Sequence, residues 1–130
     1  MITNVTHLTV FVENQDQALD FYTNKLGFKV HTDAQFGPMR WLTIHPIENK
    51  NYEISLMLAE TPEEKALVGK QAIQKPLFCV STNDCKAAVE TFKASGVTFL
   101  QDAKEEQWGT SATFVDLYGN IIYMVQPAQY

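Results

Sequence analysis

Residues 5–12, VTHLTVFV, alternate between two faces, as expected for a β-strand with one buried side. One face carries Val5, His7, Thr9 and Phe11, and the other carries Leu8, Val10 and Val12. Helical spacing follows, with apolar residues at Ala18, Leu19, Tyr22 and Leu26. Asn14 or Asp16 can cap this helix, and Gly27 can end it. The pattern predicts a strand and then a helix, with His7 on a polar and aromatic strand face.

The same order of elements occurs twice along the chain. After the first helix, strands are predicted over residues 28–32, 39–45 and 52–58, with the Gly37-Pro38 turn between the first two. A second strand–helix–strand–strand–strand series is predicted over residues 77–81, 83–94, 97–101, 111–115 and 121–125. Between the two series, Thr61, Pro62 and Glu64 form a capping-box pattern that predicts a short helix.

This repetition predicts one α+β domain, residues 1–130, built from two βαβββ modules. The first module covers about residues 1–60, a linker covers about 61–75, and the second module covers about 76–130. A ferredoxin-like α+β domain with similar elements is the alternative topology.

Composition narrows the classes of partner. The chain has 130 residues, 45% of them apolar and 19% charged, and a formal net charge of −5. An acidic surface disfavours nucleic acid and anionic membrane, since both are polyanions. The N-terminal MITNVTHL has no positive segment followed by an apolar run, and Cys79 and Cys85 have no metal or redox spacing. We therefore expect a cytoplasmic protein with two free thiols.

Two motifs resemble those of the vicinal oxygen chelate superfamily, which includes glyoxalase I, extradiol dioxygenases and bleomycin resistance proteins. The segment DQALDFYTNKLGF, with Phe21, Tyr22 and Gly27, is similar to the end of its opening strand–helix unit. Near the C-terminus, FVDLYGNIIYMVQ is similar to the superfamily's F-x-D-P-D-G motif at Asp116 and Gly119. The resemblance covers essentially the whole chain. It implies two modules that form a half-open barrel, and a homodimer.

The resemblance also implies four metal-ligand positions, in the first and last strands of each module. They fall on His7, Ser55, Lys75 and Tyr123, and only His7 is a usual ligand. A shift of two residues would replace Ser55 with Glu53, and His45 could lie at the edge of such a site. We therefore favour no cofactor, and a divalent ion such as Zn, Ni, Mn or Fe would bind through His7 and Glu53.

A ligand pocket is the main functional expectation. Its candidate residues are His7, Thr9, Phe11, Arg40, Trp41, Ser55, Trp108 and Tyr123. Arg40 could hold a carboxylate with its planar fork, and the aromatic residues could stack on a ligand. Structural roles are the alternative: His7 and Tyr123 as hydrogen-bonded core residues, Arg40 on the surface, and Trp41 and Trp108 in a core or interface. His31 is expected to be an exposed strand residue.

Two functions follow from this reading. One is a glyoxalase-like protein that binds a small molecule without the complete metal site. The other is a metal-dependent enzyme, lactoylglutathione-lyase-like or dioxygenase-like, that acts on vicinal oxygens. No nucleophile triad, phosphate loop or nucleotide fingerprint is present, so catalytic residues stay unassigned.

Overall fold

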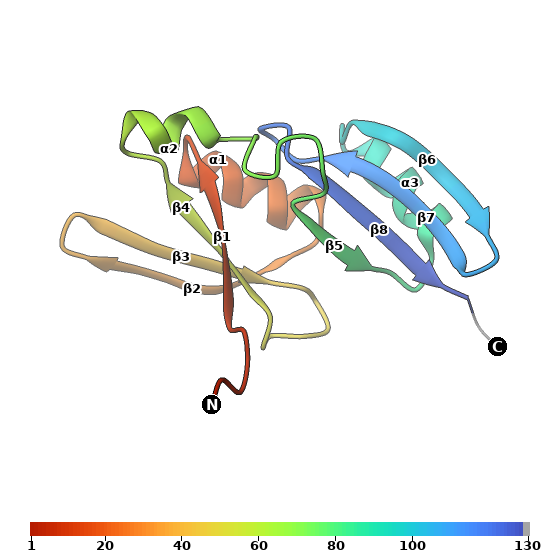
Figure 1. Cartoon of the computed structure of the whole chain (residues 1–130), viewed down its shortest axis with the longest axis horizontal. Helices are drawn as coiled ribbons and strands as arrows, with labels where there is room; N and C mark the ends of the chain where they lie inside the picture. Colours follow the sequence, from red (N-terminus) through yellow and green to blue (C-terminus); the bar gives the residue numbers. More distant parts are fainter. Residues whose placement is uncertain (129–130) are drawn as a thin grey trace. The chain divides into compact units, whose positions relative to one another are not determined.

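The computed structural model describes residues 1–128 and contains two four-stranded sheets (Figure 1). The chain divides into two compact units, Met1–Val68 and a second that begins at Gly69. Each unit contains one sheet with the strand–helix–strand–strand–strand order. The predicted α+β class with two βαβββ modules is therefore confirmed, and each unit is described by itself below.

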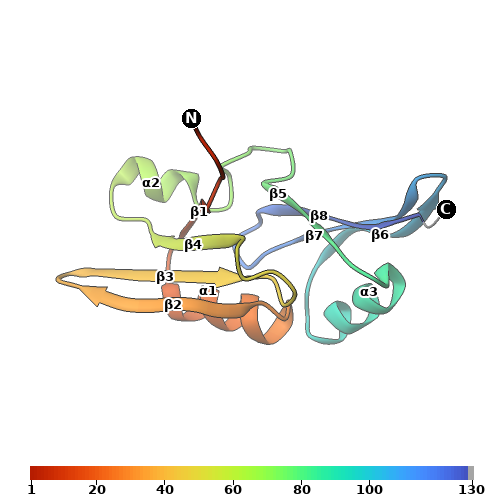
Figure 2. The same cartoon turned by 90° about the horizontal axis from the view of Figure 1, so that it is seen from below.

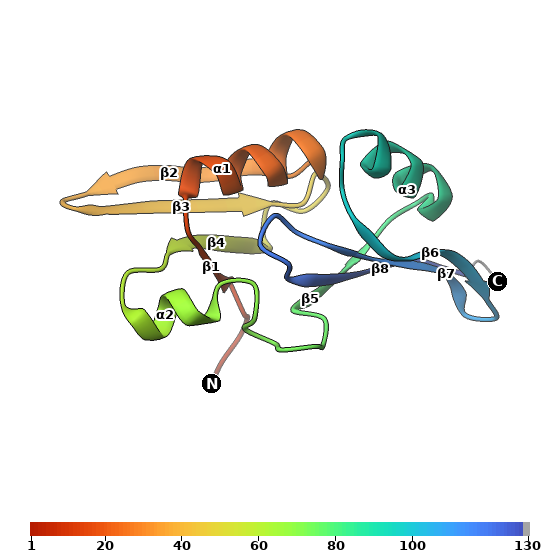
Figure 3. The ribbon, with the colours of Figure 1, turned by 90° about the horizontal axis from the view of Figure 1, so that it is seen from above.

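The first unit is a mixed sheet with a helical segment along one face. Its elements are β1 (His7–Val12), α1 (Gln15–Asp20), the π-helix η1 (Phe21–Lys25), β2 (Lys29–Phe36), β3 (Met39–His45), β4 (Glu53–Leu58) and α2 (Pro62–Leu67). The strand order is β1-β4-β3-β2, in which β1 runs parallel to β4 and the other pairs are antiparallel. Figure 2 and Figure 3 show this sheet from below and from above, and α1 packs against β4.

The first helix differs from the single helix that the sequence predicts. Asn14 is its N-cap and accepts a hydrogen bond from the Gln17 backbone N–H at 2.9 Å. After Asp20 the helix widens into η1. Two consecutive aromatic residues at its start, Phe21 and Tyr22, are both buried. A sequence pattern with a fixed period of 3.6 residues cannot show this change.

The two faces of the first sheet have different chemistry. The face toward α1 is apolar and buried, and includes Val10, Val12, Leu42, Ile44 and Leu56. Because side chains alternate along a strand, the opposite face carries His7, Thr9, Phe11, Trp41, Thr43, His45, Glu53 and Ser55. We call this second set the polar face.

The second unit repeats the arrangement with different side chains. Its elements are β5 (Phe78–Ser81), α3 (Cys85–Ala94), β6 (Phe99–Glu106), β7 (Gly109–Val115) and β8 (Ile121–Pro127), in sheet order β5-β8-β7-β6. Asp84 caps α3 by accepting from the Ala87 backbone N–H. The buried core of this unit includes Cys85, Val89, Ala112, Phe114, Ile122 and Met124.

One edge strand of each sheet extends well beyond its predicted end, and β8 ends two residues later than predicted. The prediction of 28–32 becomes Lys29–Phe36, and that of 97–101 becomes Phe99–Glu106. Both are edge strands, and their extensions carry polar and charged residues of the kind that protect an exposed edge. The apolar pattern in the sequence therefore ends several residues before each of these two strands ends.

The capping box at Thr61 and Glu64 is present as predicted. Among the described residues, no helix has the length and apolar character needed to cross a membrane.

Ile73 has a backbone conformation that disfavours its own side chain. Its φ is +61°, in the left-handed region, and the residue is 82% exposed. Changing Ile73 to glycine should raise the free energy of unfolding by about 1 kcal/mol, because the left-handed strain disappears while little buried surface is lost. Urea denaturation measures this effect. Ile47→Gly, at another exposed loop residue without a positive φ, is the control and should not stabilise the protein.

Candidate functional site

His7 and Glu53 are direct neighbours on the polar face. The parallel pairing of β1 with β4 places His7 opposite Glu53, and Thr9 opposite Ser55. His7 Nε2 lies 3.1 Å from Glu53 Oε2, and the two side chains are 34% and 13% exposed. His7 Nδ1 also lies 2.8 Å from Thr6 Oγ1. The strand register thus selects Glu53, rather than Ser55, as the β4 residue beside His7.

Glu53 contacts two further polar side chains. Thr43, on the adjacent β3, donates a hydrogen bond from Oγ1 to Glu53 Oε1 at 2.8 Å. His31, on β2, places Nδ1 at 3.1 Å from the same oxygen. One carboxylate therefore joins side chains from all four strands of the sheet. We call His7, His31, Thr43 and Glu53 the Glu53 cluster.

His31 reaches this cluster because β2 is irregular at that point. The register with β3 shifts between Val30 and Thr32, so His31 is an extra residue in the strand. An extra residue of this kind is a β-bulge, which redirects a side chain and breaks the strict alternation. The expectation of an exposed strand residue is correct for its location, since the His31 side chain is 36% exposed. Sequence reasoning missed its contact with Glu53.

The third histidine of the chain lies beside the cluster. The His31 and His45 rings are 6.0 Å apart between centroids and perpendicular to each other. His45 Nδ1 lies 2.7 Å from the Pro46 carbonyl oxygen. All three histidines of the protein are therefore linked around Glu53, directly or through His31.

Aromatic and hydroxyl side chains complete the polar face. The Trp41 ring lies 5.5 Å from the His7 ring, between centroids. Ser55 is buried, and its Oγ has no hydrogen-bond partner among the described residues. The structure thus brings together five of the predicted pocket residues, namely His7, Thr9, Phe11, Trp41 and Ser55.

Arg40 lies on the opposite face of the same sheet, apart from those five residues. It bonds Asp33 through Nε and Nη2 at 2.9 Å, and Asp16 of α1 through Nη1 at 2.7 Å. The hydrogen bonds from Arg40 lower the pKa of the Asp33 carboxyl, and those carboxylates raise the pKa of Arg40. All three guanidinium nitrogens of Arg40 therefore donate to carboxylates, and the side chain links β3 to β2 and to α1.

The remaining candidates lie in the second unit. Trp108 and Tyr123 are neighbours, with ring centroids 6.4 Å apart. Tyr123 pairs with Cys79 on β5 and with Thr113 on β7, on the side of the sheet away from the buried Ile122 and Met124. Lys75 is exposed in the turn before β5. Of the candidate residues, the second unit therefore contains the aromatic pair of Trp108 and Tyr123, and the exposed Lys75.

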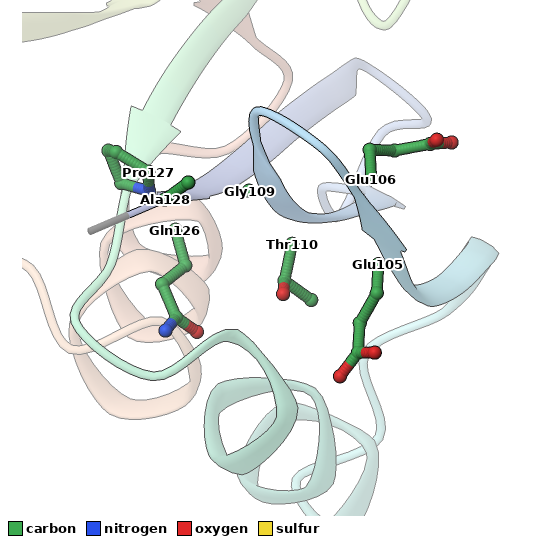
Figure 4. Close-up of a pocket in the computed structure, with 7 residues that line it drawn as sticks. All are labelled: Glu105, Glu106, Gly109, Thr110, Gln126, Pro127 and Ala128. Carbon is green, nitrogen blue, oxygen red and sulfur yellow. The ribbon is translucent and has the colours of Figure 1, made fainter. Parts of the chain in front are cut away.

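A hollow of about 330 Å³ in the second unit lies among other residues. It is lined by Glu105, Glu106, Gly109, Thr110, Gln126, Pro127 and Ala128. In Figure 4 the side chains of Glu105, Thr110 and Gln126 extend toward the same side, and that of Glu106 extends away. Gln126 accepts the backbone N–H of Cys85 at 2.8 Å, and Glu105 binds Lys86, which lowers the pKa of Glu105. These contacts attach the start of α3 to the sheet, so we assign the hollow a structural role.

Comparison with known proteins identifies the family. Residues 4–124 match the model of the Glyoxalase/Bleomycin resistance protein/Dioxygenase superfamily. The chain belongs to this superfamily. An uncharacterized protein of Shewanella frigidimarina (strain NCIMB 400) is 30% identical over 128 residues, which cover 97% of this chain and 95% of that protein.

Solved structures of the superfamily fold agree with this assignment. The crystal structure of UcmS2 has a TM-score of 0.85 and 32% sequence identity, and the match covers 96% of this chain and 98% of that one. TnmS3, an antibiotic binding protein from Streptomyces sp. CB03234, has a TM-score of 0.77 and 29% identity, with 98% of both chains covered. The glyoxalase-like fold that the resemblance implies is confirmed.

The residues of this superfamily member do not fit the four-ligand ion that the resemblance implies. Ser55 and Tyr123 offer neutral hydroxyls, and Lys75 offers a cation, where imidazole or carboxylate ligands are needed. His7 Nε2 and Glu53 Oε2 face each other at 3.1 Å. Within residues 1–128, no group of three or more His, Cys, Asp or Glu side chains is arranged to hold a metal ion.

Proposed function

We propose that this protein binds a small organic molecule on the polar face of its first sheet, without the four-ligand metal site of its superfamily. One observation carries the proposal. Glu53 holds His7, His31 and Thr43 at distances of 2.8 to 3.1 Å, and His7 in turn lies beside Trp41. The polar face therefore combines oriented hydrogen-bonding groups with an aromatic surface.

Such a combination suits ligand recognition. Binding sites for small molecules join apolar and aromatic surface with a few polar groups that fix the orientation. The imidazoles of His7 and His31 are about one-third exposed, while the carboxylate that orients them is more buried. Holding these groups in place before binding reduces the entropy lost on association. We expect a flat ring to stack on Trp41 while its polar substituents bond to the imidazoles.

The buried hydroxyl of Ser55 supports the same location. Its Oγ lies in the sheet between Thr9 and Thr43, without a hydrogen-bond partner among residues 1–128. A buried polar atom without a partner is unfavourable, and such atoms in native proteins often meet a water or a ligand. A ligand polar group above β4 would supply that partner.

A relative also supports small-molecule binding, since TnmS3 is an antibiotic binding protein. In the second unit, we propose that Trp108 and Tyr123 provide another aromatic surface for a ligand. The homodimer and the cytoplasmic location stay predictions, which light scattering and cell fractionation can test.

The metal-dependent lyase or dioxygenase is the second function. It needs an ion that can bind two vicinal oxygens of the substrate. Two hydroxyls and a lysine at three of the four expected positions disfavour it, as does the engagement of Glu53 with Thr43 and two imidazoles. We therefore favour small-molecule binding over metal-dependent catalysis as the function of this protein.

Tryptophan fluorescence tests the proposed binding face, because the chain has only Trp41 and Trp108. Trp108→Phe leaves Trp41 as the reporter, and Trp41→Phe leaves Trp108. In a screen of aromatic natural compounds, antibiotics included, we expect a bound compound to quench Trp41. Trp41→Ala should weaken its binding about tenfold, because the stacking surface is removed.

Arg40→Lys is the matched control, since Arg40 lies on the opposite face of the same sheet. It should leave the dissociation constant unchanged. Compounds that quench Trp108 alone, with affinities that do not respond to Trp41→Ala, would contradict the assignment to the first sheet.

A further inference from the structure

We propose that His31 and His45 form a binding site for one divalent transition-metal ion, with Glu53 orienting His31. This inference goes beyond the proposed function: it shares His31 and Glu53 with the proposed binding face, but it concerns a metal ion and its test needs no organic ligand. The site is also distinct from the four positions implied by the superfamily, which fall on His7 in β1, Ser55 in β4, Lys75 before β5 and Tyr123 in β8. His31 and His45 come from β2 and β3.

The neighbours of each ring favour one nitrogen over the other as a metal ligand. A carboxylate oxygen and a carbonyl oxygen only accept hydrogen bonds, so the ring nitrogen that faces either one carries the hydrogen. His31 Nδ1 lies 3.1 Å from Glu53 Oε1 and 2.9 Å from the Thr32 hydroxyl oxygen, and His45 Nδ1 lies 2.7 Å from the Pro46 carbonyl oxygen. A hydroxyl accepts as well as donates, so a hydrogen on Nδ1 of His31 suits both of its neighbours. With that hydrogen on Nδ1, the lone pair of each neutral ring lies on Nε2.

This arrangement is the one that metal-binding histidines usually have. A ligating histidine commonly donates its other ring N–H to a carboxylate or a backbone carbonyl, which fixes the ring and makes the ligating nitrogen more basic. His31 has the carboxylate partner and His45 has the carbonyl partner. His7 differs, because its Nε2 faces Glu53 and its Nδ1 faces Thr6 Oγ1, so both of its nitrogens already have partners.

The separation of the two rings suits a shared ion. Two imidazoles that bind one ion through Nε2 at about 2.1 Å place their ring centroids roughly 4.6 to 6.5 Å apart, for ligand angles between about 90° and 180°. The observed centroid distance is 6.0 Å. His31 is 36% exposed and His45 is half-buried, so an ion can reach the pair from solvent.

The β-bulge in β2 provides independent support. With regular pairing, only one residue of β2 would face Thr43, whereas the bulge adds His31 next to Thr32. Bulges are frequent beside functional sites, where they redirect a side chain. Here the redirected side chain is the one that joins His45 to Glu53.

The ligand type defines the class of metal. Imidazole nitrogen suits Ni²⁺, Cu²⁺ and Zn²⁺, whereas Mg²⁺ and Ca²⁺ prefer oxygen. Two protein nitrogens leave further coordination positions for water or for an oxygen of a bound molecule.

The test is calorimetric titration of the full chain, without a histidine tag, with Ni²⁺ and Zn²⁺. We expect about one ion per chain, and no binding of Mg²⁺. His31→Ala and His45→Ala should each abolish stoichiometric binding, whereas His7→Ala, which also removes a partner of Glu53, should retain it. Glu53→Gln should weaken binding about 10- to 100-fold, as expected for a residue that orients a ligand. Far-UV circular dichroism verifies that each variant is folded.

Cu²⁺ electron paramagnetic resonance provides a second readout, which identifies the ligand atoms of the bound ion. The spectrum should show coupling to two imidazole nitrogens in the wild type and in His7→Ala, and this two-nitrogen signal should disappear in His31→Ala and in His45→Ala. Unchanged titrations after His31→Ala and His45→Ala would overturn the proposal. Loss of binding in His7→Ala would also overturn it and would point to a His7–Glu53 site. No stoichiometric ion in the wild type would overturn the metal site and leave ligand binding at Trp41 untouched.

Discussion

Replacing Gly69 with alanine should lower the free energy of unfolding of the second unit by about 3 kcal/mol, since strain and overlap act together. Gly69 has a φ of +76°, where a side chain is strained. A Cβ atom added there would lie 1.9 Å from the Tyr118 carbonyl oxygen, which belongs to the backbone of the turn before β8. Because a backbone atom cannot rotate away as a side chain can, the turn or the Gly69 segment must move.

Gly37→Ala separates the two causes. Gly37 also has a positive φ, +59°, but a Cβ at that position would have no atom within 4 Å. It should therefore lower the free energy of unfolding by only about 1 kcal/mol. Urea denaturation in the Trp41→Phe background follows the second unit through Trp108, and the Trp108→Phe background follows the first unit. Equal losses at Gly69 and Gly37 would contradict the close approach of Gly69 to Tyr118.

Replacing Glu53 with alanine should lower the free energy of unfolding of the first unit by about 3 kcal/mol, because hydrogen bonds to a charged group are lost and a buried donor remains. Thr43 is fully buried, and its hydroxyl donates to Glu53. His7 and His31 lose the same acceptor. Urea denaturation in the Trp108→Phe background measures the change through Trp41.

Two further variants test whether the stability lost in Glu53→Ala is specific to this position and comes from the Thr43–Glu53 hydrogen bond. Glu48→Ala, at an exposed glutamate of the β3–β4 turn, should change stability by less than about 0.5 kcal/mol. Adding Thr43→Val to Glu53→Ala should recover part of the loss, because the donor without an acceptor is removed as well. If the double variant is as unstable as the sum of the single ones, then Thr43 and Glu53 are not energetically coupled.

Much of the fold could be predicted from the sequence because its signals are local. The alternation from His7 to Val12, the cap at Asn14 and the capping box at Thr61 each depend on a few adjacent residues. The order of elements then gives two βαβββ modules. The π-helix at Phe21 and the ends of β2 and β6 could not be predicted, because packing and edge pairing determine them.

The candidate site was only partly predictable for a similar reason. Strand alternation places His7, Thr9 and Phe11 on one face, and the structure adds Trp41 and Ser55 from other strands. The inclusion of Arg40 beside Trp41 is inconsistent with alternation, because adjacent residues of β3 point to opposite faces of the sheet. Arg40 bonds Asp33 and Asp16 on the helix side of the sheet. Whether the five residues on the polar face bind a ligand stays a prediction.

Glu53 illustrates the limit most clearly. Its place beside His7 depends on the register between β1 and β4, and a difference of two residues separates Glu53 from Ser55 on the same strand face. Both residues are compatible with the sequence pattern, and only the pairing of the two strands distinguishes them. His31 depends in addition on a local irregularity that leaves no apolar signature.

The bulge at His31 also determines how this site can be recognised in other members of the superfamily. The bulge gives β2 one residue more than regular pairing with β3 would need. A sequence alignment with a relative that lacks the bulge must therefore open a gap in β2, or shift the residues on one side of His31 by one position. Either outcome moves His31 out of the column that faces Glu53. A search for the site should therefore compare which side chains converge on the carboxylate in three dimensions, and should allow an insertion of one residue in the second strand.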